Sequence, residues 1–440
     1  MSAFRWFNEE LTADEMEQLI ARDLAGPQGL DLEQWPEARV TMLRELVAGL
    51  AGEDVQAAKQ AVARLQKQRK KFDAQIPTVM ILKDRPTPRP TYLLKRGAYD
   101  APDQSEELTP DVPAFLPPLP DKQPRNRLAL ARWLTDPKHP LVARVEVNRI
   151  WQRLFGQGIV KSSDNFGAQG DPPSHPMLLD WLAVEFVESG WDLKALQKTI
   201  VMSATYQQSA AATPADFQRD PENRLLARGS RFRLSAEAIR DNALAVSGLL
   251  TLRIGGPSVK PYQPDGLWKE LAGGAGEGKY VQSQSDDLFR RSLYTNRKRT
   301  VPHPTLSTFD APSFEICQAK RAVTNTPLQA LALLNDVTYV EAARGLAQRM
   351  IRKSADSPAE RVRHGFRLAT ARGPTEKELK VLLLALDRHL KTYQSDSAAA
   401  NELLKHGESP IDDAVSPTEL AAYTVVAGVI LNLDETITHE

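Results

Sequence analysis

The polar residues best suited to do chemistry lie around one loop, between two strongly apolar segments near residues 144–180. Carboxylate, amide, imidazole and guanidinium groups are all present there. If they face a common cleft, guanidinium and amide groups can grip a carboxylate, sulfate or phosphate. The candidate substrate-binding residues are Arg144, Asn148, Asp164, Asn165, Gln169, Asp171 and His175.

His175 is the member of this set with the widest chemical range. Ser174 suits a helix N-cap and Pro176 suits a first turn, so His175 is expected at a helix N-terminus, where the dipole favours a neutral imidazole. With Asp164 and Asp171 it could complete a mixed oxygen and nitrogen metal site, although the spacing matches no established ligand motif. The alternative is that the loop residues satisfy backbone groups and His175 caps or packs.

Arg144 and Asn148 are one helical turn apart and therefore share a face. Towards a cleft, that face could bind an anion. The alternative is a structural role for this face, tying loop carbonyl groups or pairing with Glu146 and Asp164.

Two other groups of residues deserve weighing. Glu237 and Asp241, four apart on a predicted helix, suit an acid/base pair or a metal, but solvation at the surface explains them as well. A basic stretch at residues 290–299 includes aromatic side chains, as in nucleic-acid and sugar sites. Flanking aspartates partly neutralise it, so we expect an ion-paired loop against the core and no nucleic-acid partner.

Composition restricts the class of protein further. Lys plus Arg and Asp plus Glu both total 56 in 440 residues, so no net charge draws the chain to nucleic acid or an anionic membrane. The single cysteine excludes a disulfide, a thiolate zinc cluster and a Cys-x-x-Cys-His haem attachment within this chain. We expect no signal peptide in this chain, and no apolar run is long enough for a transmembrane segment.

The elements that must position these groups are mainly helical. Helical periodicity dominates residues 126–250 and 327–433, with Asp192 and Ser235 as plausible N-caps. We therefore predict a mainly α fold in which a multi-helix globular core carries a loop-rich excursion near residues 255–324. Residues 1–75 indicate a helical hairpin. Residues 76–125 indicate two short strands, at 78–82 and 91–95, followed by a proline-rich connector, and residues 126–440 form the main domain.

Several separated motifs carry a family resemblance, over roughly residues 76–440. These are residues 85–97, 126–134, 147–151, 155–158, 172–176, 203–206, 224–228, 325–336 and 431–436. Together they resemble the C-terminal domain of unknown function of planctomycete-type cytochrome c multidomain proteins. The resemblance implies an exported or periplasmic protein whose haem belongs to a separate or upstream domain, because no haem motif is present here. Genes of this type accompany sulfatase-like and polysaccharide-handling functions, which points to anionic glycans.

These observations favour an exported domain that binds or processes an extracellular substrate such as an anionic polysaccharide, using the candidate residues above. One alternative is a non-enzymatic scaffold that docks to a cytochrome c domain or another partner protein. A second is a metal-dependent hydrolase. The sequence leaves open whether the protein is an enzyme.

Overall fold

The computed structural model describes residues 53–85, 87–120, 124–268, 280–353 and 357–439. The chain divides into two units, Met1–Thr91 and Tyr92–Glu440. Most of the predicted hairpin at 1–75 lies outside the described residues. Its described part is helix α3 (Glu53–Asp73).

The small β element is present, but one of its strands was predicted wrongly. Residues 78–82 form no strand, whereas β1 (Tyr92–Leu94) pairs antiparallel with β2 (Pro102–Glu107), inside the segment expected to be a connector. The turn between β1 and β2 contains Gly97, whose φ of +76° suits glycine and lets the chain reverse. No such residue stands between residues 82 and 91, where prolines stiffen the chain.

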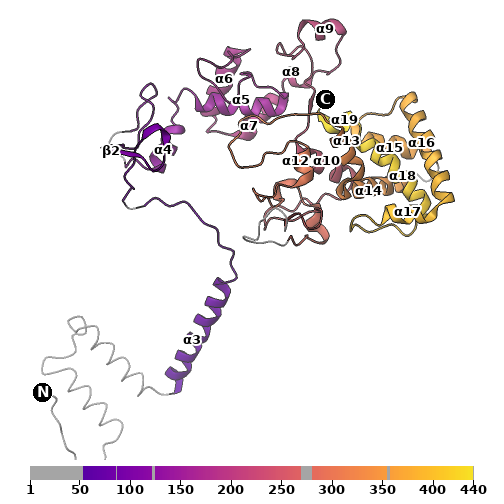
Figure 1. Cartoon of the computed structure of the whole chain (residues 1–440), viewed down its shortest axis with the longest axis horizontal. Helices are drawn as coiled ribbons and strands as arrows, with labels where there is room; N and C mark the ends of the chain where they lie inside the picture. Colours follow the sequence, from indigo (N-terminus) through magenta and orange to yellow (C-terminus); the bar gives the residue numbers. More distant parts are fainter. Residues whose placement is uncertain (1–52, 86, 121–123, 269–279, 354–356, 440) are drawn as a thin grey trace, which may run out of the picture. The chain divides into compact units, whose positions relative to one another are not determined.

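The chain from Arg127 onward is mainly helical, as predicted (Figure 1). The remaining elements in chain order are η3 (Lys95–Gly97), α4 (Arg127–Leu134), α5 (Val142–Phe155), α6 (Pro176–Glu188), α7 (Leu193–Val201), α8 (Ala204–Gln207), α9 (Pro214–Arg219), β3 (Phe232–Arg233), α10 (Ala236–Ser247), η4 (Ser285–Phe289), η5 (Ser292–Tyr294), α12 (Pro304–Thr308), α13 (Pro327–Asn335), α14 (Val337–Lys353), α15 (Pro358–Thr370), α16 (Glu376–Ser395), α17 (Ser397–Leu404), α18 (Pro417–Leu431), α19 (Asp434–Ile437) and β4 (Thr438–His439). No helix within the described ranges is both long enough and apolar enough to cross a membrane.

Helices α5, α6 and α7 share one hydrophobic core. Val147 and Trp151 of α5 are buried with Leu182 of α6 and Ile200 of α7. Asp192 caps α7 as predicted, accepting from the backbone N–H groups of Lys194 and Ala195 at 2.9 and 3.0 Å. These three helices, packed on a common core, hold the residues of the candidate site in place.

A second core surrounds α18. This helix is apolar on every side, and its Leu420, Val426 and Ile430 have no exposed surface. It packs against α14, α16 and α17, which explains why it shows no polar face. Helix α10 joins this core through Ile239 and begins at Ser235, which caps it as predicted.

The described part of residues 255–324 is largely loop, as predicted, and two buried arginines hold it. Arg240 of α10 donates to the carbonyl oxygens of Leu288 and Arg290 at 2.7 and 3.0 Å. Arg290 in turn donates to the carbonyl oxygens of Arg253 and Pro257. Backbone groups that no helix or sheet satisfies are thus bound by guanidinium groups.

Glu237 and Asp241 are not solvated surface groups. Their side chains are only 19% and 17% exposed. Glu237 pairs with Arg297 and Arg321, and Asp241 accepts from the backbone N–H of Ser292 at 2.7 Å. The expectation of surface solvation was wrong because the loop that folds over α10 supplies cations and a backbone donor. Within the basic stretch, Arg291 and Arg297 form ion pairs with Asp241 and Glu237 of α10, as expected.

Candidate functional site

Asn148, one of the predicted binding residues, has no exposed surface. Its Nδ2 donates to the carbonyl oxygen of Val160 at 3.0 Å, and its Oδ1 accepts from the N–H of the same residue at 2.8 Å. Gly158 lies so close that a Cβ there would come within 2.6 Å of the Asn148 amide. The amide is therefore used to clamp residues 158–160 onto α5.

Arg144 is turned towards α6. Its Nε donates to the Asp180 carboxylate at 2.7 Å, and its Nη1 donates to the carbonyl oxygen of Pro140. This pair joins the two helices. The predicted structural role with a bond to a carbonyl group is thus found, but the acidic partner is Asp180 and not the predicted Glu146, which pairs with Arg149, or Asp164.

The predicted loop residues Asp164, Asn165, Gln169 and Asp171 are exposed. The loop closes on itself through Ser162, whose Oγ donates to the carbonyl oxygen of Asn165 and accepts from the N–H of Asp171. The structure therefore does not gather these side chains into a cleft with Asn148.

His175 is half-buried and is itself the N-cap residue of α6. Its Nδ1 lies 3.0 Å from Ser174 Oγ. The prediction of Ser174 as N-cap was wrong, since its hydroxyl donates to the carbonyl oxygen of Ile159 at 3.3 Å instead. The chain before α6 is thereby tied to the segment that Asn148 clamps.

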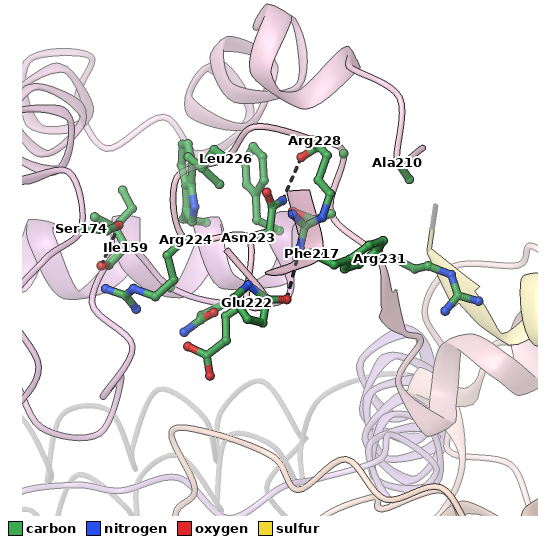
Figure 2. Close-up of a pocket in the computed structure, with 17 residues that line it drawn as sticks. Ile159, Ser174, Ala210, Phe217, Glu222, Asn223, Arg224, Leu226, Arg228 and Arg231 are labelled. Atoms are coloured by element: carbon green, nitrogen blue, oxygen red, sulfur yellow. Dashed lines mark hydrogen bonds between the residues drawn. The ribbon is translucent and has the colours of Figure 1, made fainter. Parts of the chain in front are cut away.

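A pocket of about 330 Å³ lies beside the end of α5, and we call it the α5 pocket (Figure 2). None of the seven predicted binding residues lines it, although Ser174 does. Its lining residues are Trp151, Phe155, Gln157, Gly158, Ile159, Ser174, Ala210, Phe217, Pro221, Glu222, Asn223, Arg224, Leu226, Arg228, Gly229, Ser230 and Arg231.

The turn that supplies most of the polar wall spans residues 220–229. Asp220 starts it, accepting from the backbone N–H groups of Arg224 and Leu225 at 2.9 and 2.7 Å. Asn223 and Leu226 then adopt left-handed φ values of 52° and 55°, which fold the chain back on itself. Arg224 and Arg228, four residues apart, face the pocket because of this path and not because of a helix.

The charges of the pocket differ in how far the protein itself satisfies them. Glu222 binds Lys161 at 2.6 Å, and this hydrogen bond, with the charge of Lys161, lowers the pKa of the Glu222 carboxyl. No hydrogen bond from the Arg224 guanidinium to another described residue is found, and its side chain reaches towards Ser174 (Figure 2). Arg224 is therefore the cation most available to a ligand.

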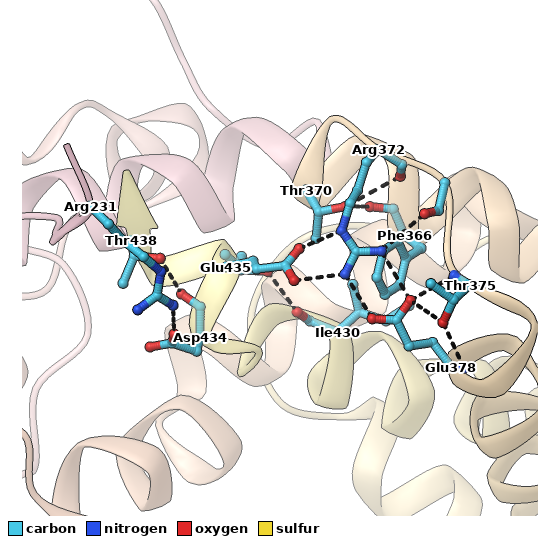
Figure 3. A network of polar contacts seen from close by, with 12 residues as sticks. Arg231, Phe366, Thr370, Arg372, Thr375, Glu378, Ile430, Asp434, Glu435 and Thr438 are labelled. Carbon is cyan, nitrogen blue, oxygen red and sulfur yellow. Dashed lines mark hydrogen bonds and ion pairs between the residues drawn. The ribbon is translucent and has the colours of Figure 1, made fainter. Parts of the chain in front are cut away.

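Arg231, at the edge of the pocket, belongs to a network that holds the last helices (Figure 3). Its Nη2 binds Asp434. In the same region Arg372 bridges Glu378 at 2.7 Å and Glu435 at 2.6 Å. The hydrogen bond from Arg372, together with those from Thr375, lowers the pKa of Glu378 to about 2. The guanidinium of Arg231 is thus already paired with a carboxylate of α19.

Arg228, which is buried, and Asn223, which is half-buried, form a polar wall of the pocket. The Nη2 atom of Arg228 donates to the carbonyl oxygens of Asp220 and Pro221 at 2.8 and 3.1 Å, and its guanidinium lies 4.5 Å from the centre of the Phe217 ring. Asn223 Nδ2 donates to the carbonyl oxygen of Arg228 at 2.8 Å. Within the described residues, Arg228 Nη1 and Asn223 Oδ1 are buried without a hydrogen-bond partner. Each such atom costs about 1–3 kcal/mol.

Sequence reasoning missed this wall. Arg224 and Arg228 carried only a family resemblance, although the arginines at 219, 224, 228 and 231 are a local enrichment that could have indicated a site. Among all the residues that the structure describes, no group of three or more His, Cys, Asp or Glu side chains is placed to hold a metal ion.

Comparison with known proteins gives one family. No curated protein and no solved structure matches the chain. The model of the PSD1 family, described as proteins of unknown function (DUF1553), matches residues 126–386 and so includes both α5 and the turn that lines the pocket. This family occurs in planctomycete cytochrome c-containing proteins. Because the match covers more than half of the sequence, the chain belongs to the PSD1 family of proteins of unknown function.

Proposed function

We propose that this domain is exported and binds an acidic extracellular polysaccharide in the α5 pocket. The observation that carries the proposal is the Arg224 guanidinium, which faces a partly apolar pocket without a hydrogen-bonded partner among the described residues. A guanidinium group binds carboxylate and sulfate through two parallel hydrogen bonds. The pocket volume of about 330 Å³ suits a short part of a polymer, since small-molecule sites begin near this size.

The walls suit a sugar as well as its charge. Trp151, Phe155 and Phe217 provide aromatic surface, on which the C–H faces of a sugar ring can pack. Ser174 and Gln157 add neutral polar groups near Arg224. Apolar walls with a few fixed polar groups are typical of small-molecule sites.

The loop at residues 164–171 is a weaker candidate for the same ligand. Asp164 and Asp171 are exposed carboxylates and would repel an acidic polymer. The substrate-binding role predicted for the seven residues stays a prediction, and the α5 pocket has the more suitable charge.

Binding is better supported than hydrolysis. Hydrolysis of a glycosidic bond requires two carboxyl groups across the substrate, with few exceptions. Glu222 is the carboxylate that lines the α5 pocket, and Lys161 holds it. The predicted scaffold and metal-dependent alternatives have no comparable observation in their favour.

Replacing Arg224 with glutamine tests the proposal. We expect Arg224→Gln to weaken binding of polygalacturonate or hyaluronan at least about tenfold, as loss of a charge-assisted contact should. Isothermal titration calorimetry at two salt concentrations measures this. The loss should be larger at low salt, because screening weakens the contact in the parent protein.

Arg153→Gln is the matched control, since Arg153 is an exposed arginine of α5 that does not line the pocket. It should leave the affinity unchanged. If the parent protein binds neither polymer, or if both variants lose affinity equally, the proposal is wrong.

A further inference from the structure

We infer that the α5 pocket selects an N-acylated amino sugar within the acidic polysaccharide, an inference that rests on the proposed function. It is carried by the two buried, unpartnered atoms of the wall, Arg228 Nη1 and Asn223 Oδ1. Arg228 is 6% exposed, and both residues line the pocket.

Neighbouring bonds fix what each atom can offer. The Nδ2 atom of Asn223 donates to the carbonyl oxygen of Arg228, so the other end of the amide is an acceptor. The Nη2 atom of Arg228 is held by the carbonyl oxygens of Asp220 and Pro221, so Nη1 remains a donor. The wall thus presents one donor and one acceptor.

A secondary amide matches this pair. Its carbonyl oxygen can accept from Arg228 Nη1 while its N–H donates to Asn223 Oδ1. A carboxylate or sulfate carries acceptors only, so it would leave Asn223 Oδ1 without a donor. A hydroxyl can serve both atoms, but the methyl of an acetamido group also fills the apolar space beside Phe155, Ile159 and Leu226. Arg224 then takes the acidic group of the neighbouring sugar.

To reach Arg228 Nη1 and Asn223 Oδ1, the amide of the ligand must displace a side chain that covers them. Both atoms are covered in this structure. Phe217 lies over the guanidinium and is 51% exposed, so we assign the displacement to an outward turn of this ring. It belongs to α9, a helix of six residues.

The test compares forms of hyaluronan that differ only in the substituent on nitrogen, and adds one unrelated acidic polymer. Hyaluronan oligosaccharides, their N-deacetylated form and the same material after re-acetylation are titrated into the full chain by calorimetry, with polygalacturonate as an acidic polymer that lacks amides. We expect the two acetylated forms to bind at least about tenfold tighter than the other two, because a site built for hydrogen bonds rejects a ligand that lacks them.

The variant Asn223→Gly keeps a left-handed residue at this position and removes the acceptor. It should bind all four ligands with the affinity that the parent protein has for the deacetylated form. Arg228→Lys keeps the charge and should also lose the preference. Arg153→Gln should retain it, and unfolding curves establish that each variant is folded.

The outcomes are distinct. If the parent protein binds acetylated and deacetylated forms equally, the inference is wrong and the proposed function stands. If it binds no acidic polymer, the proposed function fails. If an N-acetylated peptide competes as well as the oligosaccharide, the ligand is a polypeptide amide and the assignment to an amino sugar is overturned.

Discussion

Buried arginine residues stabilise the irregular parts of this chain by binding backbone carbonyl groups. Arg228, Arg240, Arg290 and Arg344 are all buried, and each donates to at least two of them. Five N–H groups in a rigid plane suit this task, since turns leave carbonyl groups that no helix or sheet satisfies. The sequence shows that residues 290–299 form a basic stretch. It does not show which of these arginines is buried, because burial depends on contacts between residues far apart in the chain.

The buried His303, which lies near Arg240, leads to a prediction about how stability depends on pH. Burial and the positive charge of Arg240 lower the pKa of its imidazole to about 4, from 6.5. The unfolded chain therefore binds a proton before the folded chain does as the pH falls. As the pH is lowered from 6.5 to 4, the free energy of unfolding should fall by up to about 3 kcal/mol. Above pH 6.5 the stabilising contribution of neutral His303 is fully present.

Urea unfolding of the parent protein and of His303→Phe, at pH 7.5 and pH 4.5, measures this effect. Phenylalanine supplies a ring of similar size that does not titrate. The variant should lose less stability at pH 4.5 than the parent does. Equal losses would show that His303 does not take up a proton on unfolding.

At the scale of elements, helices were predictable and their connections were not. The helical periodicity over residues 126–250 includes α5, whose apolar stripe and closing Gly156, with φ of +76°, are local signals. The strand at 102–107 and the turn at 220–229 were missed. Both depend on where the backbone reverses direction. In the turn at 220–229 it reverses at Asn223 and Leu226, which adopt left-handed conformations that the pattern of polar and apolar residues does not reveal.

The clamp between α5 and residues 158–160 can be tested through Asn148. Asn148→Leu keeps the side-chain size and removes both hydrogen bonds, leaving the buried N–H and C=O of Val160 without partners. The free energy of unfolding should fall by about 3 kcal/mol. Because Gly158 and Ile159 line the α5 pocket, the polysaccharide binding that we propose for this pocket should weaken too.

Arg149→Gln is the control for this helix. Arg149 is exposed and pairs with Glu146 one turn away, a type of contact worth about 0.5 kcal/mol. Chemical unfolding of both variants decides the matter. A loss below about 1 kcal/mol in Asn148→Leu would mean that the clamp is dispensable.

At the scale of the whole molecule, the segment that matches the family model ends before the last helices of the second core. The match ends at residue 386, within α16, whereas α18 lies at the centre of the second core. Sequence alone predicted helices to residue 433 but could not show which of them is central. That role follows from packing against α14 and α16.

We therefore expect a fragment of residues 126–386 to fail to fold cooperatively. Without α18 the apolar face of α14, including Leu346 and Ala347, would be exposed to water. Thermal melts followed by circular dichroism should show one sharp transition for residues 92–440 and none for the fragment. A sharp transition in the fragment would show that the matched segment is an independent domain.

The pairing of β3 with β4 has a consequence for how the molecule is made. His439 bonds to Tyr206, 233 positions earlier, and stacks on Phe232 beside the turn that ends α5. During translation the earlier partners leave the ribosome long before the later one exists. The nascent chain therefore exposes this edge of its core until residue 439 is made, and chaperones have that interval in which to engage it.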